Sequence, residues 1–211
     1  MLRKQHDCVI IANGAFPASS EIRKCLSEAE CIIACDGAVN NLTEAGIEPH
    51  FIVGDLDSLT PELRERFSAI VFHNPDQETN DLTKAAEFAC ARGFRNPVIL
   101  GATGLREDHT LGNISLLTKY CALFDSVKMV SDFGTFIPIT RTTRFESMPG
   151  QQISIFALFP FGAITTHGLR YPINERELPV WWEGTLNEAT GDHFTIELKG
   201  HGNVLVYLRH P

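Results

Sequence analysis

Short apolar runs, each followed by acidic residues, recur through the first three fifths of this chain. The acidic segments are 35–38 (CDGA), 54–58 (GDLDS), 76–81 (DQETND) and 106–109 (REDH). Helical patterns lie between the runs; in the first, apolar residues at 22, 25, 26 and 29 keep the i, i+3, i+4, i+7 spacing of one buried helix face. Strands that alternate with helices predict a mostly parallel sheet with helices on both faces. The carboxyl ends of parallel strands share one edge, so we expect the acidic segments to meet there, where α/β folds bind ligands.

The expected elements have local signals. Thr60-Pro61-Glu62 gives one helix a cap, a first-turn proline and an early acid, and Asn80 is a plausible cap for another. Gly46 suits the left-handed end of a short helix. The predicted strands are 9–12, 31–35, 51–54, 69–72 and 98–101. Five helices are predicted between and after them. Three start at Ser20, Thr60 and Asn80, one short helix ends near Gly46, and the last contains Leu111.

The texture of the sequence changes after about residue 126. Short β-branched or aromatic runs, separated by Gly, Pro and Asn turns, occupy 136–140, 151–158, 194–198 and 204–208. We therefore predict two domains, an α/β domain over 1–126 and a smaller antiparallel all-β domain over 127–211.

Composition limits the class of protein. A net charge of -8 over 211 residues argues against broad binding to nucleic acid or anionic membranes. The apolar segment 8–12 is too short for a signal-peptide core or a membrane span. The six cysteines form no CxxC pair, which favours reduced core thiols over disulfides or a zinc site. These features predict a cytoplasmic protein.

Carboxylates gathered at one edge would repel one another unless a cation neutralised them. Oxygen-only ligands favour magnesium, carrying a phosphorylated substrate. Asp55 and Asp57, at i and i+2 after a buried strand, can reach one cation from a turn, although an Asx-turn with a helix cap explains them too. Asp81 and Lys84 fall on one helical face, and a cap and dipole partner at the helix start is the alternative reading of Asp81.

One turn, a histidine within it and one aromatic pair complete the candidates. The glycine-containing turn 101–109 carries Arg106, as a phosphate-binding loop would, but it lacks the lysine and hydroxyl residue of a P-loop. His109 is either a base or a hydrogen-bonded structural group. Trp181-Trp182 is either a hydrophobic plug or an aromatic platform for a flat cationic ligand.

Taken in order, these segments resemble the thiamine pyrophosphokinase family over nearly the whole chain. The matching segments are 36–38, 54–58, 81–85, 101–109 with Asn113, 168–172 and 184–188. The resemblance implies an α/β catalytic domain, a C-terminal β-sandwich and a homodimer. We further predict sites between subunits, because the β domain has no chemistry of its own yet exposes aromatic and amide groups that suit thiamine. It also implies a magnesium-dependent transfer of pyrophosphate from ATP to thiamine, which releases AMP.

The resemblance further implies roles for particular residues. Asp55, Asp57 and Asp81 are the expected magnesium ligands and catalytic residues, with Asp81 a candidate acceptor of the hydroxyl proton. Nucleotide binding is expected from Asn13, Gly14, Asp36, Gly37, Lys84, Arg106, Asp108 and Asn113. Thiamine binding is expected from Gln77, Asn80, Trp181, Trp182 and Asn187.

The chain departs from the family pattern at three positions: Asn80 replaces a threonine, Leu105 a glycine, and Leu186 a serine whose hydroxyl is expected to help hold thiamine. Two other functions use the same acidic edge. A metal-dependent nucleotide phosphohydrolase would admit water and need no acceptor, and a noncatalytic regulator would bind nucleotide without turnover.

Overall fold

A computed structural model of the chain describes residues 6–158 and 162–211. It divides into two compact units, Met1–Asp132 (unit 1) and Phe133–Pro211 (unit 2). This division lies six residues beyond the predicted boundary, because strand β6 (Lys128–Ser131) pairs in parallel with β5 (Pro97–Leu100) and so completes the first sheet.

Unit 1 is built on a parallel sheet. Its strands lie in the order β6-β5-β1-β2-β3-β4, and every neighbouring pair runs in parallel. Besides β5 and β6 these are β1 (Cys8–Ile11), β2 (Ile32–Cys35), β3 (Phe51–Gly54) and β4 (Val71–His73). In the central register Ile10 lies opposite Ile33 on one side and Ile99 on the other. The central strands are apolar at every position because helices cover both faces.

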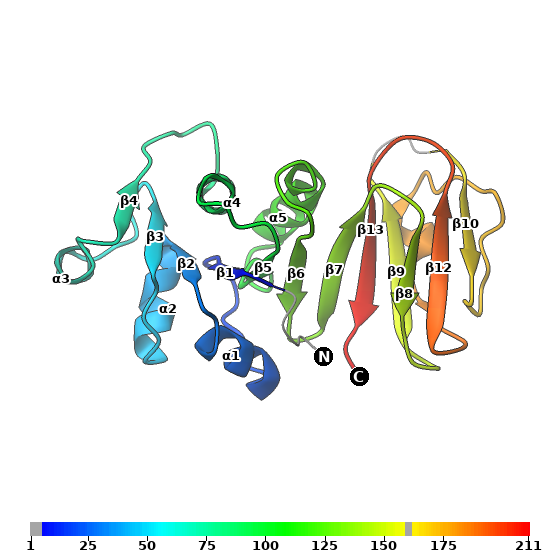
Figure 1. Cartoon of the computed structure of the whole chain (residues 1–211), viewed down its shortest axis with the longest axis horizontal. Helices are drawn as coiled ribbons and strands as arrows, with labels where there is room; N and C mark the ends of the chain where they lie inside the picture. The colour runs from blue at the N-terminus through cyan, green and yellow to red at the C-terminus, as the bar shows by residue number, and fades with distance from the viewer. Residues whose placement is uncertain (1–5, 159–161) are drawn as a thin grey trace. The chain divides into compact units, whose positions relative to one another are not determined.

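The helices of unit 1 cover the two faces of its sheet, as Figure 1 shows. Helices α1 (Ser20–Ser27) and α2 (Val39–Glu44) pack Ile22, Leu26 and Leu42 into one core with β1 and β2. Helix α4 (Asp81–Ala91) contacts β1, β2 and β3, and α5 (Glu107–Tyr120) lies beside it. The structure confirms the predicted mostly parallel sheet with flanking helices.

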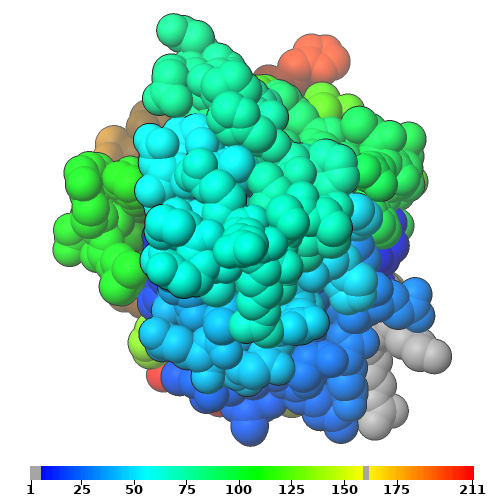
Figure 2. Space-filling model, turned by 90° about the vertical axis from the view of Figure 1, so that its left-hand side faces the viewer, coloured from blue at the N-terminus to red at the C-terminus, as the bar shows by residue number. Residues whose placement is uncertain are grey.

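Helix α3 (Pro61–Arg66) and β4 lie at the edge of unit 1 that faces the viewer in Figure 2, where they are drawn in teal. The predicted caps are confirmed, since Thr60 accepts a hydrogen bond from the Leu63 N–H at 3.3 Å and Asn80 accepts one from the Thr83 N–H at 2.9 Å. No helix in the described residues is long and apolar enough to span a membrane.

Unit 2 is an antiparallel β-sandwich, as predicted. One sheet has the order β11-β9-β13-β7 and the other β10-β12-β8. Their inner faces share one core that includes Ile155, Val206, Phe145 and Phe194. The strands are β7 (Gly134–Ile139), β8 (Thr143–Glu146), β9 (Gln152–Ala157), β10 (Ile164–His167), β11 (Asn187–Glu188), β12 (His193–Leu198) and β13 (Val204–Arg209).

Candidate functional site

The strand order of unit 1 reverses between β1 and β5, since the chain runs outward from β1 to β4 and then returns to the other side of β1. Such a switch point opens a crevice at the carboxyl ends of the strands. Here the loops after β1 and β5 touch, with the Gly14 N–H donating to the Gly101 carbonyl at 2.5 Å. A side chain at Gly14 would lie 2.4 Å from that oxygen, so only glycine permits this approach.

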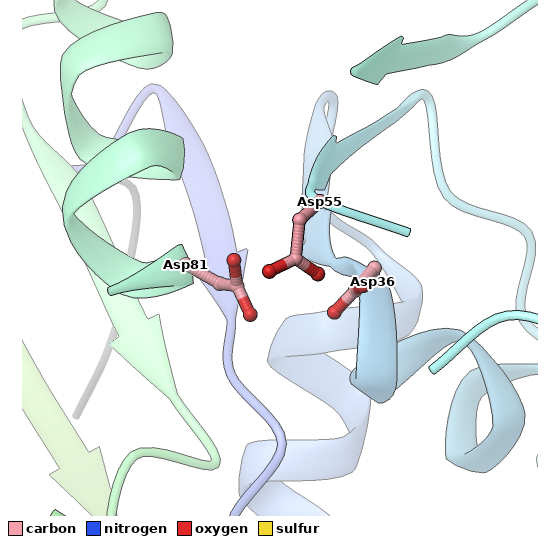
Figure 3. A group of neighbouring side chains, drawn as sticks. All are labelled: Asp36, Asp55 and Asp81. Atoms are coloured by element: carbon pink, nitrogen blue, oxygen red, sulfur yellow. The ribbon is translucent and has the colours of Figure 1, made fainter. Parts of the chain in front are cut away.

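Three carboxylates converge beside this crevice. Oxygens of Asp36, Asp55 and Asp81 all lie within 4.8 Å of one another, and we call this group the acid trio. Figure 3 shows the three side chains turned toward a common point, from the 3-10 turn after β2, the end of β3 and the start of α4. The alternation of strand and helix thus brings together residues separated by as many as 45 positions in the chain.

Asp36 is the buried member of the acid trio. Its side chain packs against Gly54, where a Cβ atom would lie 2.9 Å from the Asp36 carboxyl carbon. One oxygen accepts the Gly37 N–H at 2.6 Å, whereas Oδ2 is buried without a hydrogen-bond partner among the described residues. Burial, and secondarily the Asp81 charge, raise the pKa of Asp36. An unpaired buried carboxylate oxygen is costly, and a bound cation would satisfy it.

Asp55 is held by its own loop and by the segment between β4 and α4. The Asp57 N–H donates to its Oδ1 at 3.3 Å and the Gln77 amide donates to Oδ2 at 3.2 Å, and the Asp57 bond is the main reason that the pKa of Asp55 is lowered. Leu56 between them has a left-handed backbone, with φ of 70°. Strain of this kind in a non-glycine residue is concentrated at functional loops.

The acid trio differs from the predicted metal ligands in one member. Asp36, expected to frame the nucleotide, takes part, whereas Asp57 is exposed and lies outside the group. The turn at Leu56 explains the difference, since it brings the backbone N–H of Asp57, and not its carboxylate, to Asp55.

Lys84 neutralises part of the acid trio. Its ammonium lies 3.1 Å from Asp81 Oδ1 and 3.8 Å from Asp55 Oδ2, and its side chain is only 2% exposed. Because Lys84 follows Asp81 by three residues on α4, both project from one face of the helix, as predicted. The sequence indicated this pairing but not that the lysine is buried.

A cavity of about 540 Å³ opens over the acid trio. Ten predicted site residues line it, namely Asn13, Gly14, Asp36, Asp55, Gln77, Asn80, Asp81, Lys84, Arg106 and Asn113. Asp57, Gly37 and Asp108, although described, are not among its lining residues. Thr103 and Thr110 also line the cavity, and sequence reasoning missed both. For Thr103 the available signal was its position in a glycine turn before a helix, whereas Thr110 lies in the first turn of α5 (Glu107–Tyr120).

Arg106 and Asp108 pair at the mouth of the cavity. Arg106 Nε and Nη2 donate to the two carboxylate oxygens at 3.1 and 2.6 Å, and both side chains are exposed. The arginine lowers the pKa of Asp108 to about 2. Since a guanidinium carries five N–H donors, further donors of Arg106 remain for an anion in the cavity.

The predicted residues of unit 2 divide into exposed rings and a buried amide. Trp182 in η2 (Trp181–Gly184) is 71% exposed, and Leu186, with φ of 57°, is 75% exposed. Trp181 meets Phe156 edge-on at 6.2 Å. Asn187 is buried. Its side-chain oxygen accepts a hydrogen bond from the Tyr171 N–H, and its side-chain nitrogen donates one to the Tyr171 carbonyl. The tryptophans can therefore meet a ligand, while Asn187 holds the neighbouring loop.

Comparison with known proteins identifies the family. Residues 22–130 match the model "Thiamin pyrophosphokinase, catalytic domain", and residues 134–207 match "Thiamin pyrophosphokinase, substrate-binding domain". The chain belongs to the thiamin pyrophosphokinase family. Thiamine pyrophosphokinase 3 of rice is 41% identical over 183 residues, covering 73% of this chain and 68% of the relative. The Bacillus subtilis enzyme is 27% identical over 173 residues, covering 78% and 80%.

Solved structures of thiamin pyrophosphokinases share the fold. The Bacillus subtilis structure has a TM-score of 0.79 at 24% identity, over 96% of this chain and 98% of that one. The yeast structure has a TM-score of 0.79 at 15% identity, over 98% and 88%. The chain spans about half the length of some curated relatives, with 55% of thiamine pyrophosphokinase 1 from rice and 50% of that from Caenorhabditis elegans matched.

Proposed function

We propose that this protein is a thiamine pyrophosphokinase that transfers pyrophosphate from ATP to the hydroxyl of thiamine and releases AMP. The observation that carries the proposal is the acid trio and buried Lys84 at the floor of a switch-point cavity, in a chain of this family. The cavity volume suits a nucleotide-sized ligand.

The acid trio fits a magnesium ion. Its donors are all carboxylate oxygens, and the buried Oδ2 of Asp36 lacks a partner among the described residues. Asp36, Asp55 and Asp81 would hold the ion, which when bound neutralises phosphate oxygens. That Asp57 is a further ligand stays a prediction. In this structure its backbone N–H supports Asp55.

The residues of the cavity can then position the nucleotide and remove one proton. Arg106 and Lys84 would contact phosphate oxygens, while Asn13 and Asn113 would frame the nucleotide with Asp36 and Gly37 behind them. The thiamine oxygen forms a bond to the β-phosphorus as the bond from that phosphorus to the AMP oxygen breaks. Asp81, half-buried at the start of α4, would accept the hydroxyl proton.

We assign thiamine binding to Gln77 and Asn80 at the cavity and to Trp181 and Trp182 of unit 2. An exposed indole suits a flat cationic ring. We further propose a homodimer in which unit 2 of one copy completes the site of the other. We also propose a cytoplasmic location, which is supported by six cysteines that are all free thiols, since thiols stay reduced in the cytosol.

One assay tests the reaction. The full chain is incubated with ATP and Mg²⁺, with or without thiamine, and AMP and thiamine diphosphate are measured. The proposal expects both products in equal amounts and only when thiamine is present. AMP or phosphate without thiamine would indicate the phosphohydrolase, and nucleotide binding without any product would indicate the regulator. Asp55→Asn is the matched control, which should abolish both products.

A further inference from the structure

Lys84 holds an unusual position for a residue expected to bind phosphate. Its ammonium is buried, and in the described residues it forms ion pairs with Asp55 and Asp81, two members of the acid trio. A buried ammonium is tolerated only with such partners, since desolvation of an unpaired charge is costly. The carboxylates that a cation would need are therefore already engaged by a cation that belongs to the chain.

The backbone that carries Lys84 is held in the protein core. Lys84 lies in the first turn of α4, flanked by Thr83 and Ala85, which are buried to 2% and 0% exposure. Thr83 is further tied to Tyr120 of α5 by a buried hydroxyl bond of 3.1 Å. The backbone that carries Lys84 is thus fixed, so the ammonium can move only as far as its own side chain reaches, between the acid trio and the cavity that Lys84 lines.

We propose that Lys84 is a built-in competitor for the divalent cation, which weakens binding of the free ion and couples its uptake to the nucleotide. The inference rests on the proposed binding of ATP in this cavity, and it does not depend on the proposed transfer of pyrophosphate to thiamine. Like charges repel strongly where water is scarce, so Lys84 opposes a free cation at the acid trio. Phosphate oxygens in the cavity would attract the ammonium, which has three donors and here gives one to Asp81.

The test measures binding of Mn²⁺ alone, as the paramagnetic probe of the acid trio. Lys84→Met removes the charge and keeps an apolar stem of similar length. We expect it to bind Mn²⁺ about tenfold more tightly than the unchanged protein, as followed by electron paramagnetic resonance of the free ion. Lys84→Arg keeps the charge and should show no gain. Lys119→Met makes the same change at an exposed lysine of α5 and should leave the affinity unchanged.

A second titration includes α,β-methylene-ATP, in which the reacting bond cannot be cleaved. With this analogue the advantage of Lys84→Met should shrink or reverse, because the ammonium then assists the phosphates. Equal or weaker binding of free Mn²⁺ by Lys84→Met would overturn the proposal. Lys84→Gln provides a second neutral variant, and unfolding curves in EDTA establish that each variant is folded. Neither titration involves thiamine or turnover, so a wrong reaction assignment would leave this result standing.

Discussion

At the scale of single residues, Asp36 combines burial with an oxygen that has no partner among the described residues. Burial and the neighbouring Asp81 charge raise its pKa, so the folded protein holds this proton more tightly than the unfolded chain does. Protonation of Asp36 therefore favours the folded state. Its contribution to stability is complete below the ordinary aspartate pKa, about 3.9, and is lost as the pH rises through the higher pKa of the folded protein. At neutral pH, Asp36 therefore destabilises the fold.

Asp36→Asn should accordingly raise the free energy of unfolding at pH 7.5 by about 1 kcal/mol in EDTA, while abolishing turnover. The gain should diminish as the pH is lowered toward 5. Urea unfolding at both values measures it. Asp57→Asn, an exposed aspartate of the neighbouring loop, is the control and should change stability little. A loss of stability in Asp36→Asn at neutral pH would show that the carboxylate is satisfied in the folded protein.

At the scale of elements, helix α1 has a remote cap. Its N-cap, Ser19, makes no side-chain cap bond. Instead the carboxylate of Asp132, which follows β6, accepts the N–H groups of Ala18 and Ser19, each at 2.9 Å. A carboxylate at this end also suits the helix dipole.

Asp132→Ala should lower the free energy of unfolding by about 1–2 kcal/mol, because two backbone donors at the start of α1 lose a charged acceptor. Asp125→Ala, at an exposed aspartate earlier in the chain, should cost less than about 0.5 kcal/mol. Urea denaturation of the two variants provides the comparison. Equal values for both would mean that solvent replaces the Asp132 carboxylate without cost.

The contrast between α4 and α1 shows what the sequence could predict. Asn80, Asp81 and Lys84 lie within one helical turn, so local spacing indicated the cap and the ion pair, and the structure contains both. The bond from Asp132 to Ala18 spans 114 positions and has no local signal. Strand β11 escaped prediction because two residues show no periodicity.

Entry of Asp36 into the acid trio was likewise beyond local reasoning. It depends on the close approach of the 3-10 turn after β2 to the end of β3 at Gly54, which only tertiary packing determines. By contrast, the position of the cavity followed from the parallel order of the strands. The sequence thus predicted the edge and most of its residues, but not which carboxylates converge.

At the scale of the whole molecule, the proposed chemistry is divided between two units. The acid trio lies in unit 1, whereas the exposed Trp182 and Leu186 lie in unit 2. Leu186 keeps a left-handed backbone although it is neither glycine nor buried, and the Leu186 N–H donates to the Ser154 hydroxyl at 3.3 Å. Exposed aromatic and aliphatic groups close together on one segment are typical of a surface that another molecule covers.

Subunit mixing tests whether that other molecule includes a second copy of this chain. Asp55→Asn inactivates the acid trio and Trp182→Ala removes the exposed ring, so each variant alone should be nearly inactive. If each site combines unit 1 of one copy with unit 2 of the other, random exchange yields half heterodimers, each with one intact site. The mixture should then recover about a quarter of the unchanged activity.

The decisive control is a mixture of Asp55→Asn with Asp81→Asn. Every site in its heterodimers carries a damaged acid trio, so no arrangement of subunits restores activity. Exchange is followed independently with differently tagged copies. Recovery of activity when Asp55→Asn is mixed with Trp182→Ala, and none when it is mixed with Asp81→Asn, would establish a shared site. Only the first mixture gives heterodimers that carry both defects in one site and leave the other site intact. Absence of recovery in both, despite demonstrated exchange, would place the acid trio and Trp182 of one chain in the same site.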